Sequence, residues 1–207
     1  MARPRKTEYA NRAVVKIENA FWKLLETEKY TDITVLRIVQ DSGVNRNSFY
    51  YHYKGMDDLA YQAFKNNTRN DASRMMISSI LTVLTLQDDE KNSDIDMSIL
   101  PNSRRIMLCA RSESTYLKQL VNDFLKEIWL DSFSINEECL TTEEKLQLDF
   151  IFAGIVTTLG SQEIENNPLL MLKLVLSEIG KSMLLTMKKI SVAQNNRFLE
   201  TKQNLQG

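Results

Sequence analysis

The chain contains very few of the residues that let a backbone turn sharply: six glycines and three prolines in 207 residues. Average usage would place Gly or Pro at roughly 12% of positions. A β-sandwich, a barrel or a doubly wound sheet needs many tight turns, and most of those turns use Gly, Pro or Asn-Gly pairs. The scarcity therefore predicts an all-α fold.

The composition is that of a globular protein, with 43% apolar and 26% charged residues. This balance excludes a disordered or fibrous chain. A chain of this length can bury about 70% of the surface that it exposes when unfolded. We expect one or two compact domains.

The net charge of −1 conceals an asymmetry along the chain. Residues 1–70 carry 12 Lys and Arg against 8 Asp and Glu, whereas residues 71–207 carry 14 against 19. A basic first part joined to an acidic second part indicates two different partners. A polyanion such as nucleic acid suits the first.

The two cysteines, Cys109 and Cys139, have no histidine or further cysteine nearby that could complete a metal site. We interpret them as structural thiols, with a redox-sensing pair as the alternative, and expect neither a metal nor a cofactor. Residues 1–12 are basic but no apolar stretch follows, so they do not form a secretory signal. No segment reaches the ~18 apolar residues of a membrane span, which predicts a cytoplasmic protein without membrane contact.

Helix signals crowd the first part of the chain. Apolar residues at three- and four-residue spacing predict a helix over about 7–28. Thr34 suits the N-cap of a second, short helix that Gly43 ends, because glycine adopts a left-handed turn cheaply. Asn45 suits the N-cap of a third helix over 46–52.

The middle of the chain is expected to alternate between helix and solvated loop. A fourth helix opens with an acidic pair and continues from about 58 toward 84. The stretch 87–96 carries five acidic residues and is predicted to be a loop. A helix over 116–133 has a wide apolar stripe and is predicted to be largely buried.

Two long helices are expected toward the end. Thr141 and Glu144 have the spacing of a capping box that starts a helix to about 162, and Asn167-Pro168 starts the next one. The polar segment 191–207 is expected to fray. Both helices are too apolar for one buried face, which predicts a four-helix dimer interface; a wholly intramolecular core is the alternative. The predicted interface residues are Phe150, Gly154, Leu169, Leu172, Leu176, Ile179 and Met183.

The segment from Thr34 to Tyr53 has the arrangement of a helix-turn-helix: a helix, a Gly-containing turn and a short polar and aromatic helix. Phe49 and Tyr53, four residues apart, are predicted to anchor the second helix, while Val39 and Val44 pack across the turn. The residues left to face outward are Arg46, Asn47, Ser48, Tyr50 and Tyr51.

These outward residues have the chemistry that a DNA major groove requires. Arg pairs with guanine, Asn pairs with adenine, and Ser and Tyr hydroxyls reach base edges or phosphates. Residues at the rim of such a helix normally hold phosphates and fix the register. The predicted DNA contacts are Thr34, Asn45, Arg46, Asn47, Ser48, Tyr50, Tyr51, His52 and Lys54.

The segment from Tyr30 to Leu59, YTDITVLRIVQDSGVNRNSFYYHYKGMDDL, resembles the N-terminal signature of the tetracycline-repressor (TetR) family of bacterial transcription regulators. The shared elements are an aromatic after the first helix, a Thr opening the second, Gly-Val in the turn, Phe-Tyr-x-His-aromatic, and an acidic-Leu pair. The resemblance covers residues 7–70 well and the remainder only as a helical plan. The chain departs from the family pattern at Lys29, Val39, Ser42 and Met56.

The resemblance implies a DNA-binding domain over 1–56 and a helical ligand-binding and dimerisation domain over 57–207. It implies that Arg46, Asn47, Ser48 and Tyr50 face bases and that Tyr51, His52 and Lys54 contact the backbone. A basic arm of Arg3, Arg5 and Lys6 can add phosphate contacts. The implied function is a ligand-responsive repressor that binds a palindromic operator as a homodimer. Candidate residues for lining the effector pocket are Met107, Phe124, Trp129, Phe133, Phe150 and Phe152.

Two other functions are alternatives to this one. A co-regulator would act through protein contacts with weak or no DNA binding, an alternative that the departures at Val39, Ser42 and Met56 keep open. An enzyme would have to use Ser48 with His52, the chain's one histidine. No nucleophile elbow, oxyanion loop, P-loop or dinucleotide fingerprint accompanies that pair, so the protein is not expected to be an enzyme.

Overall fold

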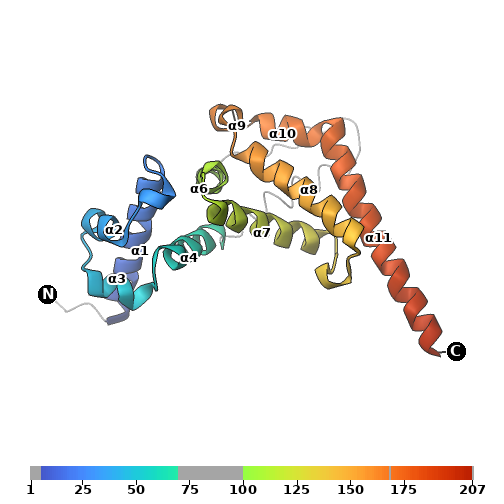
Figure 1. Cartoon of the computed structure of the whole chain (residues 1–207), viewed down its shortest axis with the longest axis horizontal. Coiled ribbons are helices and arrows are strands. Elements are labelled where there is room, and N and C mark those ends of the chain that lie inside the picture. Colours follow the sequence, from blue (N-terminus) through green and yellow to red (C-terminus); the bar gives the residue numbers. More distant parts are fainter. Residues whose placement is uncertain (1–5, 70–99, 168, 207) are drawn as a thin grey trace.

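The computed structural model describes residues 6–69, 100–167 and 169–206, and every regular element within these ranges is a helix (Figure 1). The all-α prediction is confirmed. The α-helices are α1 (Lys6–Leu25), α2 (Val35–Ser42), α3 (Arg46–His52), α4 (Met56–Thr68), α6 (Leu100–Arg111), α7 (Thr115–Ser132), α8 (Thr142–Leu159), α9 (Gln162–Asn166), α10 (Leu169–Leu176) and α11 (Glu178–Gln206). Two short 3₁₀ turns are η1 (Tyr30–Asp32) and η3 (Glu137–Cys139).

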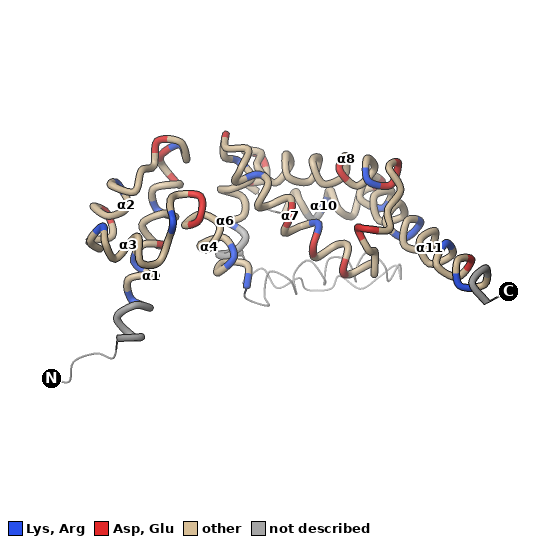
Figure 2. The backbone as a smooth tube through the Cα atoms, turned by 60° about the horizontal axis from the view of Figure 1, so that its bottom comes forward, with Lys and Arg blue, Asp and Glu red and all other residues tan. Residues whose placement is uncertain are grey.

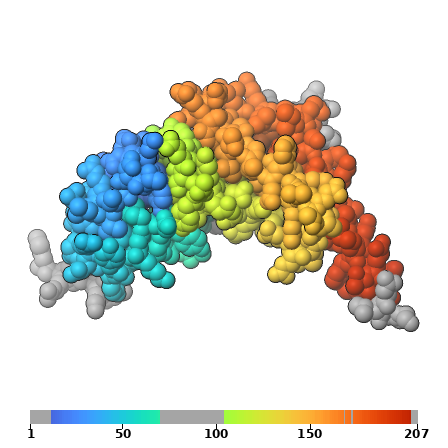
Figure 3. Space-filling model, viewed as in Figure 1, coloured from blue at the N-terminus to red at the C-terminus, as the bar shows by residue number. Residues whose placement is uncertain are grey.

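Helices α1, α2 and α3 pack against one another and form a unit that we call the head. Its core consists of side chains that are fully buried, among them Phe21, Ile38 and Phe49. Figure 3 shows the head, in blue and cyan, against the yellow-green α6, with the red end of α11 at the opposite side. We call the helices from α6 onward the body.

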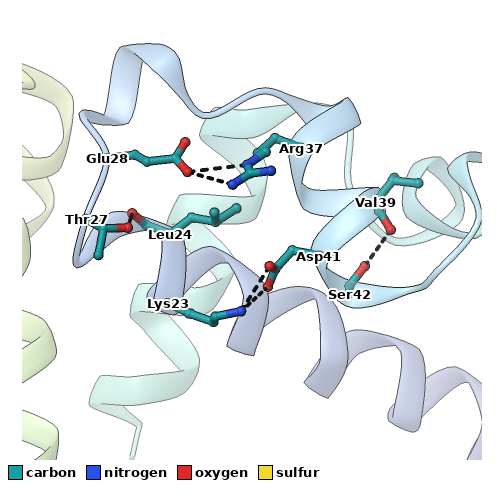
Figure 4. Close-up of polar contacts among 8 residues, drawn as sticks. All are labelled: Lys23, Leu24, Thr27, Glu28, Arg37, Val39, Asp41 and Ser42. Atoms are coloured by element: carbon teal, nitrogen blue, oxygen red, sulfur yellow. Dashed lines mark hydrogen bonds and ion pairs between the residues drawn. The ribbon is translucent and has the colours of Figure 1, made fainter.

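Two ion pairs tie α2 to the end of α1 (Figure 4). Lys23 Nζ lies 3.0 Å from Asp41 Oδ1, and Arg37 Nη2 lies 3.1 Å from Glu28 Oε1. Exposed pairs of this kind contribute at most about 1 kcal/mol each. The buried apolar side chains therefore stabilise the head, and the ion pairs add a small contribution at its surface.

Helix α4 joins the head to the body, because it packs against α1 on one side and against α6 and α7 on the other (Figure 1). Near its start the hydroxyl of Tyr30 donates to the Asp57 carboxylate, and the hydroxyl of Tyr116 on α7 donates to the Asp57 carbonyl at 3.0 Å. The two tyrosine rings stack with centroids 6.4 Å apart. Head, α4 and α7 are therefore in direct contact.

The body is built on α7 and α8, whose apolar stripes meet in a common core with α6 and α11. The predicted capping box is confirmed: Glu144 N donates to Thr141 Oγ1, and Thr141 N donates to the Glu144 carboxylate. Helix α8 ends at Leu159, before the predicted end near 162. Gly160 follows it and lies so close to α6 that a Cβ there would be 2.5 Å from the carbonyl oxygen of Ala110.

The prediction of one helix after Pro168 was wrong, since the chain forms α10 and α11 with a break at Ser177. The hydroxyl of Ser177 donates to the carbonyl of Leu174. The backbone carbonyl of Ser177 accepts the N–H of Lys181 at 3.0 Å. Gly180 then approaches α10 so closely that a Cβ would collide with the backbone of Val175. The apolar spacing continues across this break, so it did not predict two separate helices.

The expectation of a frayed tail over 191–207 was also wrong, because α11 continues to Gln206 (Figure 1). Ser191 donates to the carbonyl of Phe133 at 2.7 Å. The carboxamide of Gln194 bonds both the N–H and the carbonyl of Asn136, each at 2.8 Å. These polar side chains bind the turn between α7 and α8. The polar sequence of the segment did not indicate this contact.

Arg197 adds to this attachment. Its Nη1 and Nη2 donate to Oε1 and Oε2 of Glu144 at 2.9 and 2.8 Å. The bond to Arg197 lowers the pKa of the Glu144 carboxyl. The pKa of Glu144 is lower in the folded than in the unfolded chain. The ion pair with Arg197 therefore stabilises the fold fully above the unfolded pKa of Glu144, and this stabilisation is lost as the pH falls through the folded pKa.

We expect Arg197→Met to lower the urea midpoint of unfolding at pH 7, because it leaves the largely buried Glu144 carboxylate without its cation. The difference from wild type should shrink as the pH drops below the ordinary carboxyl pKa of 4.5. Urea unfolding followed by circular dichroism at several pH values checks this. Lys202→Met, on the same helix, is the control, and an equal effect of both variants at pH 7 would refute the assignment.

Three predictions lie outside the described residues: the continuation of the fourth helix from 70 to 84, the acidic loop 87–96, and the arm of Arg3 and Arg5. Within the described ranges, no helix is both long and apolar enough to cross a bilayer. The same ranges hold no group of three or more His, Cys, Asp or Glu residues arranged to hold a metal ion.

Candidate nucleic-acid interface

Three capping residues, all of which the sequence predicts, set both ends of α2 and the start of α3. Thr34 Oγ1 accepts the N–H of Arg37 at 3.3 Å and starts α2. Gly43 ends α2 in the left-handed conformation, with φ 65°. Asn45 Oδ1 accepts the N–H of Ser48 at 2.8 Å and starts α3. These local bonds fix where α3 begins relative to α2.

Helix α3 has one buried face and one exposed face. Phe49 and Tyr53 are 0% and 4% exposed and pack on the head, as predicted, and Val39 and Val44 pack against the same core. On the other face, Tyr51 is 77% exposed. The predicted base-facing residues Arg46, Asn47 and Tyr50 are also exposed, whereas Ser48 and His52 are half-buried. The exposed residues of α3 lie at positions 46, 47, 50 and 51, a spacing that places them on one face of the helix.

Arg46, the first residue of α3, is an exposed cation on this helix. Its guanidinium carbon lies 5.6 Å from the ring centroid of Tyr50, a cation–π contact that orients the side chain. Among the described residues it has no carboxylate partner. By contrast, Asp41 and Glu28 neutralise Lys23 and Arg37 (Figure 4), so those two charges are not free for an anionic ligand.

The rim residues keep donors available. Thr34 and Asn45 use their side-chain oxygens as caps, which leaves the Thr34 hydroxyl hydrogen and the Asn45 amide N–H groups unused by the caps. Lys54 is exposed and follows α3, where its own N–H donates to Asp58 Oδ2 at 2.8 Å. Lys and Arg are spread along the helices of the head (Figure 2), and donors of this kind suit phosphates.

The predicted pocket residues differ in their surroundings within the described part of the chain. Phe124 is buried against the ring of Phe64, with centroids 5.8 Å apart, and Phe152 is buried. Met107 and Phe133 are half-buried. The two that line a common cavity, between α8, α10 and α11, are Trp129 and Phe150.

The predicted interface residues come from α8, α10 and α11. Phe150 is 84% exposed and Ile179 is 64% exposed. Gly154, Leu169 and Leu176 are also exposed, and Met183 is half-buried. The side chain of Leu172 lies outside the described residues.

Sequence reasoning missed further exposed apolar residues next to this set. Leu146, on α8, is 65% exposed. On α11, the exposed Leu185, Val192 and Leu199 recur every seventh position and so share one helix face. That spacing is present in the sequence, but the polar residues around it favour a frayed tail.

The cysteines do not form a pair: Cys109 is buried and Cys139 is exposed. Burial raises the pKa of the Cys109 thiol to about 12. A thiol with so high a pKa holds almost no thiolate at neutral pH and is unreactive. Cys109 is therefore a packing residue, as expected for a structural thiol.

An all-α chain whose exposed α3 follows a capped, glycine-containing turn is a helix-turn-helix protein. One similar curated protein bears the name uncharacterized HTH-type transcriptional regulator YxbF, from Bacillus subtilis (strain 168). The two are 25% identical over 157 residues, which cover 73% of this chain and 40% of that protein. No protein-family model matches the chain, and no solved structure gives a significant match.

Proposed function

We propose that the protein is a transcription regulator that binds double-stranded DNA through the exposed face of α3. The observation that carries the proposal is Arg46, exposed and held over Tyr50 without a carboxylate partner in the described residues, beside Asn47 on the same face. Arg and Asn are the side chains that pair with guanine and adenine in the major groove. The name of the B. subtilis relative agrees, although the chain spans about 40% of that protein's length.

The finer proposal is a cytoplasmic, ligand-responsive repressor of the TetR family, without enzymatic activity or cofactor. The family signature in residues 30–59 supports it, as does a head followed by a helical body. In this account a homodimer binds a palindromic operator, because a two-fold axis of the protein imposes one on the DNA. The two half-sites are then separated by about one helical turn or a multiple of it.

The proposed dimer face lies on α8 and α11. An open groove of about 770 Å³ between them is lined by Leu146, Phe150, Ile179 and Met183 among others. Large exposed apolar patches on a monomer mark interaction sites. A second copy is the occupant that we propose, because the seven-residue stripe of α11 suits helix-on-helix packing with its own copy.

The contacts at the start of α4 provide a route for ligand response. Asp57 bonds Tyr30 of the head and Tyr116 of the body, so a displacement of α7 changes the support of the head. A ligand weakens operator binding only through its different affinities for the two arrangements. If the protein does not respond to a ligand, the proposed DNA binding is not affected.

Titration of a mixed-sequence DNA duplex at several salt concentrations tests DNA binding. We expect log affinity to fall linearly with log salt, because phosphate contacts release counterions. Lys54→Ala should weaken binding to all sequences alike and reduce the slope by about 1. Lys118→Ala, an exposed lysine on α7, should change neither. No binding at low salt would favour the co-regulator alternative.

A further inference from the structure

A cavity of about 270 Å³ lies where α8, α10 and α11 meet, and α7 contributes Trp129 to its lining. Ile155 lines it from α8, Met171 from α10 and Met183 from α11. None of the described residues that line it carries a charge. Cavities with apolar walls and a few polar groups are the usual form of small-molecule sites.

Trp129, which lines this cavity, carries an indole N–H that has no partner among the described residues. The residue is 6% exposed, and its Nε1 is buried with no hydrogen-bond acceptor in the described part of the chain. A buried donor left unpaired costs about 1–3 kcal/mol, and most buried donors in proteins are paired. Within the described residues, Trp129 therefore lacks the acceptor that such a group normally has.

Trp22 also has an indole that is unpaired among the described residues, but it does not line the cavity. Its Nε1 is buried, and Trp22 belongs to the head. The guanidinium of Arg105 covers its ring at 5.2 Å. An unpaired indole alone is not a site, whereas Trp129 combines one with space for a ligand.

We propose that this cavity binds an uncharged, mostly apolar molecule carrying one hydrogen-bond acceptor, such as a ketone or ester oxygen, which accepts the indole N–H of Trp129. A cavity of about 150 Å³ holds benzene, so this one suits a molecule of about two rings. Met171 and Met183 can adapt to its shape, because the methionine side chain is flexible.

The inference deepens the proposed function, because it gives the effector a chemical class and a place. Phe150, Ile179 and Met183 line both this cavity and the groove proposed to be the dimer face. A molecule that fills the cavity changes how α8 and α11 are held apart. Ligand binding and dimer geometry are thereby coupled through shared side chains.

The test uses the full chain labelled with ¹⁵N, with Trp22→Phe so that the indole N–H resonance of Trp129 is observed by itself. Benzophenone and diphenylmethane are the probes, since both have two rings and only the first has an acceptor oxygen. Benzophenone should shift the resonance. It should bind about three- to tenfold more tightly than diphenylmethane, which is the difference in affinity that one hydrogen bond provides. If Trp22→Phe does not fold, Trp129→Phe assigns the two resonances of the wild type.

Trp129→Phe keeps an aromatic ring and removes the donor, so it should abolish the preference for benzophenone. The proposal is overturned if the resonance does not shift, if the two probes bind equally, or if the preference persists in Trp129→Phe. DNA titration without probe should be unchanged by Trp129→Phe. If the protein binds the probes as expected but does not bind DNA, the regulator function is wrong. The proposed ligand class of the cavity then remains supported.

Discussion

Phe49→Ala will lower the free energy of unfolding by about 3–5 kcal/mol, the usual cost of removing a buried phenylalanine side chain. Phe49 is fully buried, and its ring lies 5.5 Å from that of Tyr53 and 5.3 Å from that of Tyr50. Helix α3 has only seven residues, so packing rather than helix propensity holds it in place. The loss is a large part of the roughly 5–15 kcal/mol that stabilises a typical domain, and DNA binding should vanish with it.

Urea unfolding of the variant, followed by circular dichroism, measures this loss. Tyr51→Ala is the matched control, because it removes an aromatic ring from the exposed face of the same helix. It should change stability by less than about 0.5 kcal/mol while weakening DNA binding. A Phe49→Ala protein as stable as wild type would mean that α3 does not pack on the head as described.

Phe150→Asp will convert the proposed dimer into a folded monomer. Phe150 is 84% exposed in the single chain, so the substitution leaves the fold intact. A two-fold contact includes the new carboxylate from both copies, and like charges placed together in an interface cost several kcal/mol. We expect dimer affinity to fall by more than about 100-fold, which corresponds to about 3 kcal/mol.

Sedimentation analysis over a range of concentrations measures the association. Val15→Asp, which replaces an exposed apolar residue of α1, should leave the oligomeric state unchanged. Affinity for a two-half-site operator should fall with dimerisation in Phe150→Asp. A wild-type protein that is monomeric at all concentrations would contradict the proposed face.

The sequence predicted those features of the fold that depend on residues within a few positions of one another. Thr34, Gly43 and Asn45 each act on a backbone group at most four residues away, as do Thr141 and Glu144. Residue type and spacing are enough to recognise such bonds. The helical periodicity similarly separated the buried from the exposed face of α3.

Features that depend on contacts between distant segments were not predictable in this way. The polar end of α11 is helical because Gln194 and Arg197 bind residues more than fifty positions away. The break at Ser177 is different: it involves a short-range approach of Gly180 to Val175, which the continuing apolar spacing of the segment did not indicate.

Helical spacing of aromatic residues also cannot distinguish a core position from a cavity wall. It placed Phe124 and Phe152 in the same set as Trp129 and Phe150. The structure buries the first two and gives the other two to a common cavity. The cavity forms where several helices meet, so no pattern within one helix identifies it.

Selection of bound fragments from a random double-stranded DNA pool, with wild type and Arg46→Ala side by side, tests whether α3 reads DNA sequence. We expect wild type to enrich one inverted repeat. Arg46→Ala should lose about 1–3 kcal/mol of affinity and relax the preference at one symmetric position in each half-site. If wild type enriches no motif even at low salt, or if Arg46→Ala selects the same motif with the same affinity, then the exposed face of α3 does not read DNA.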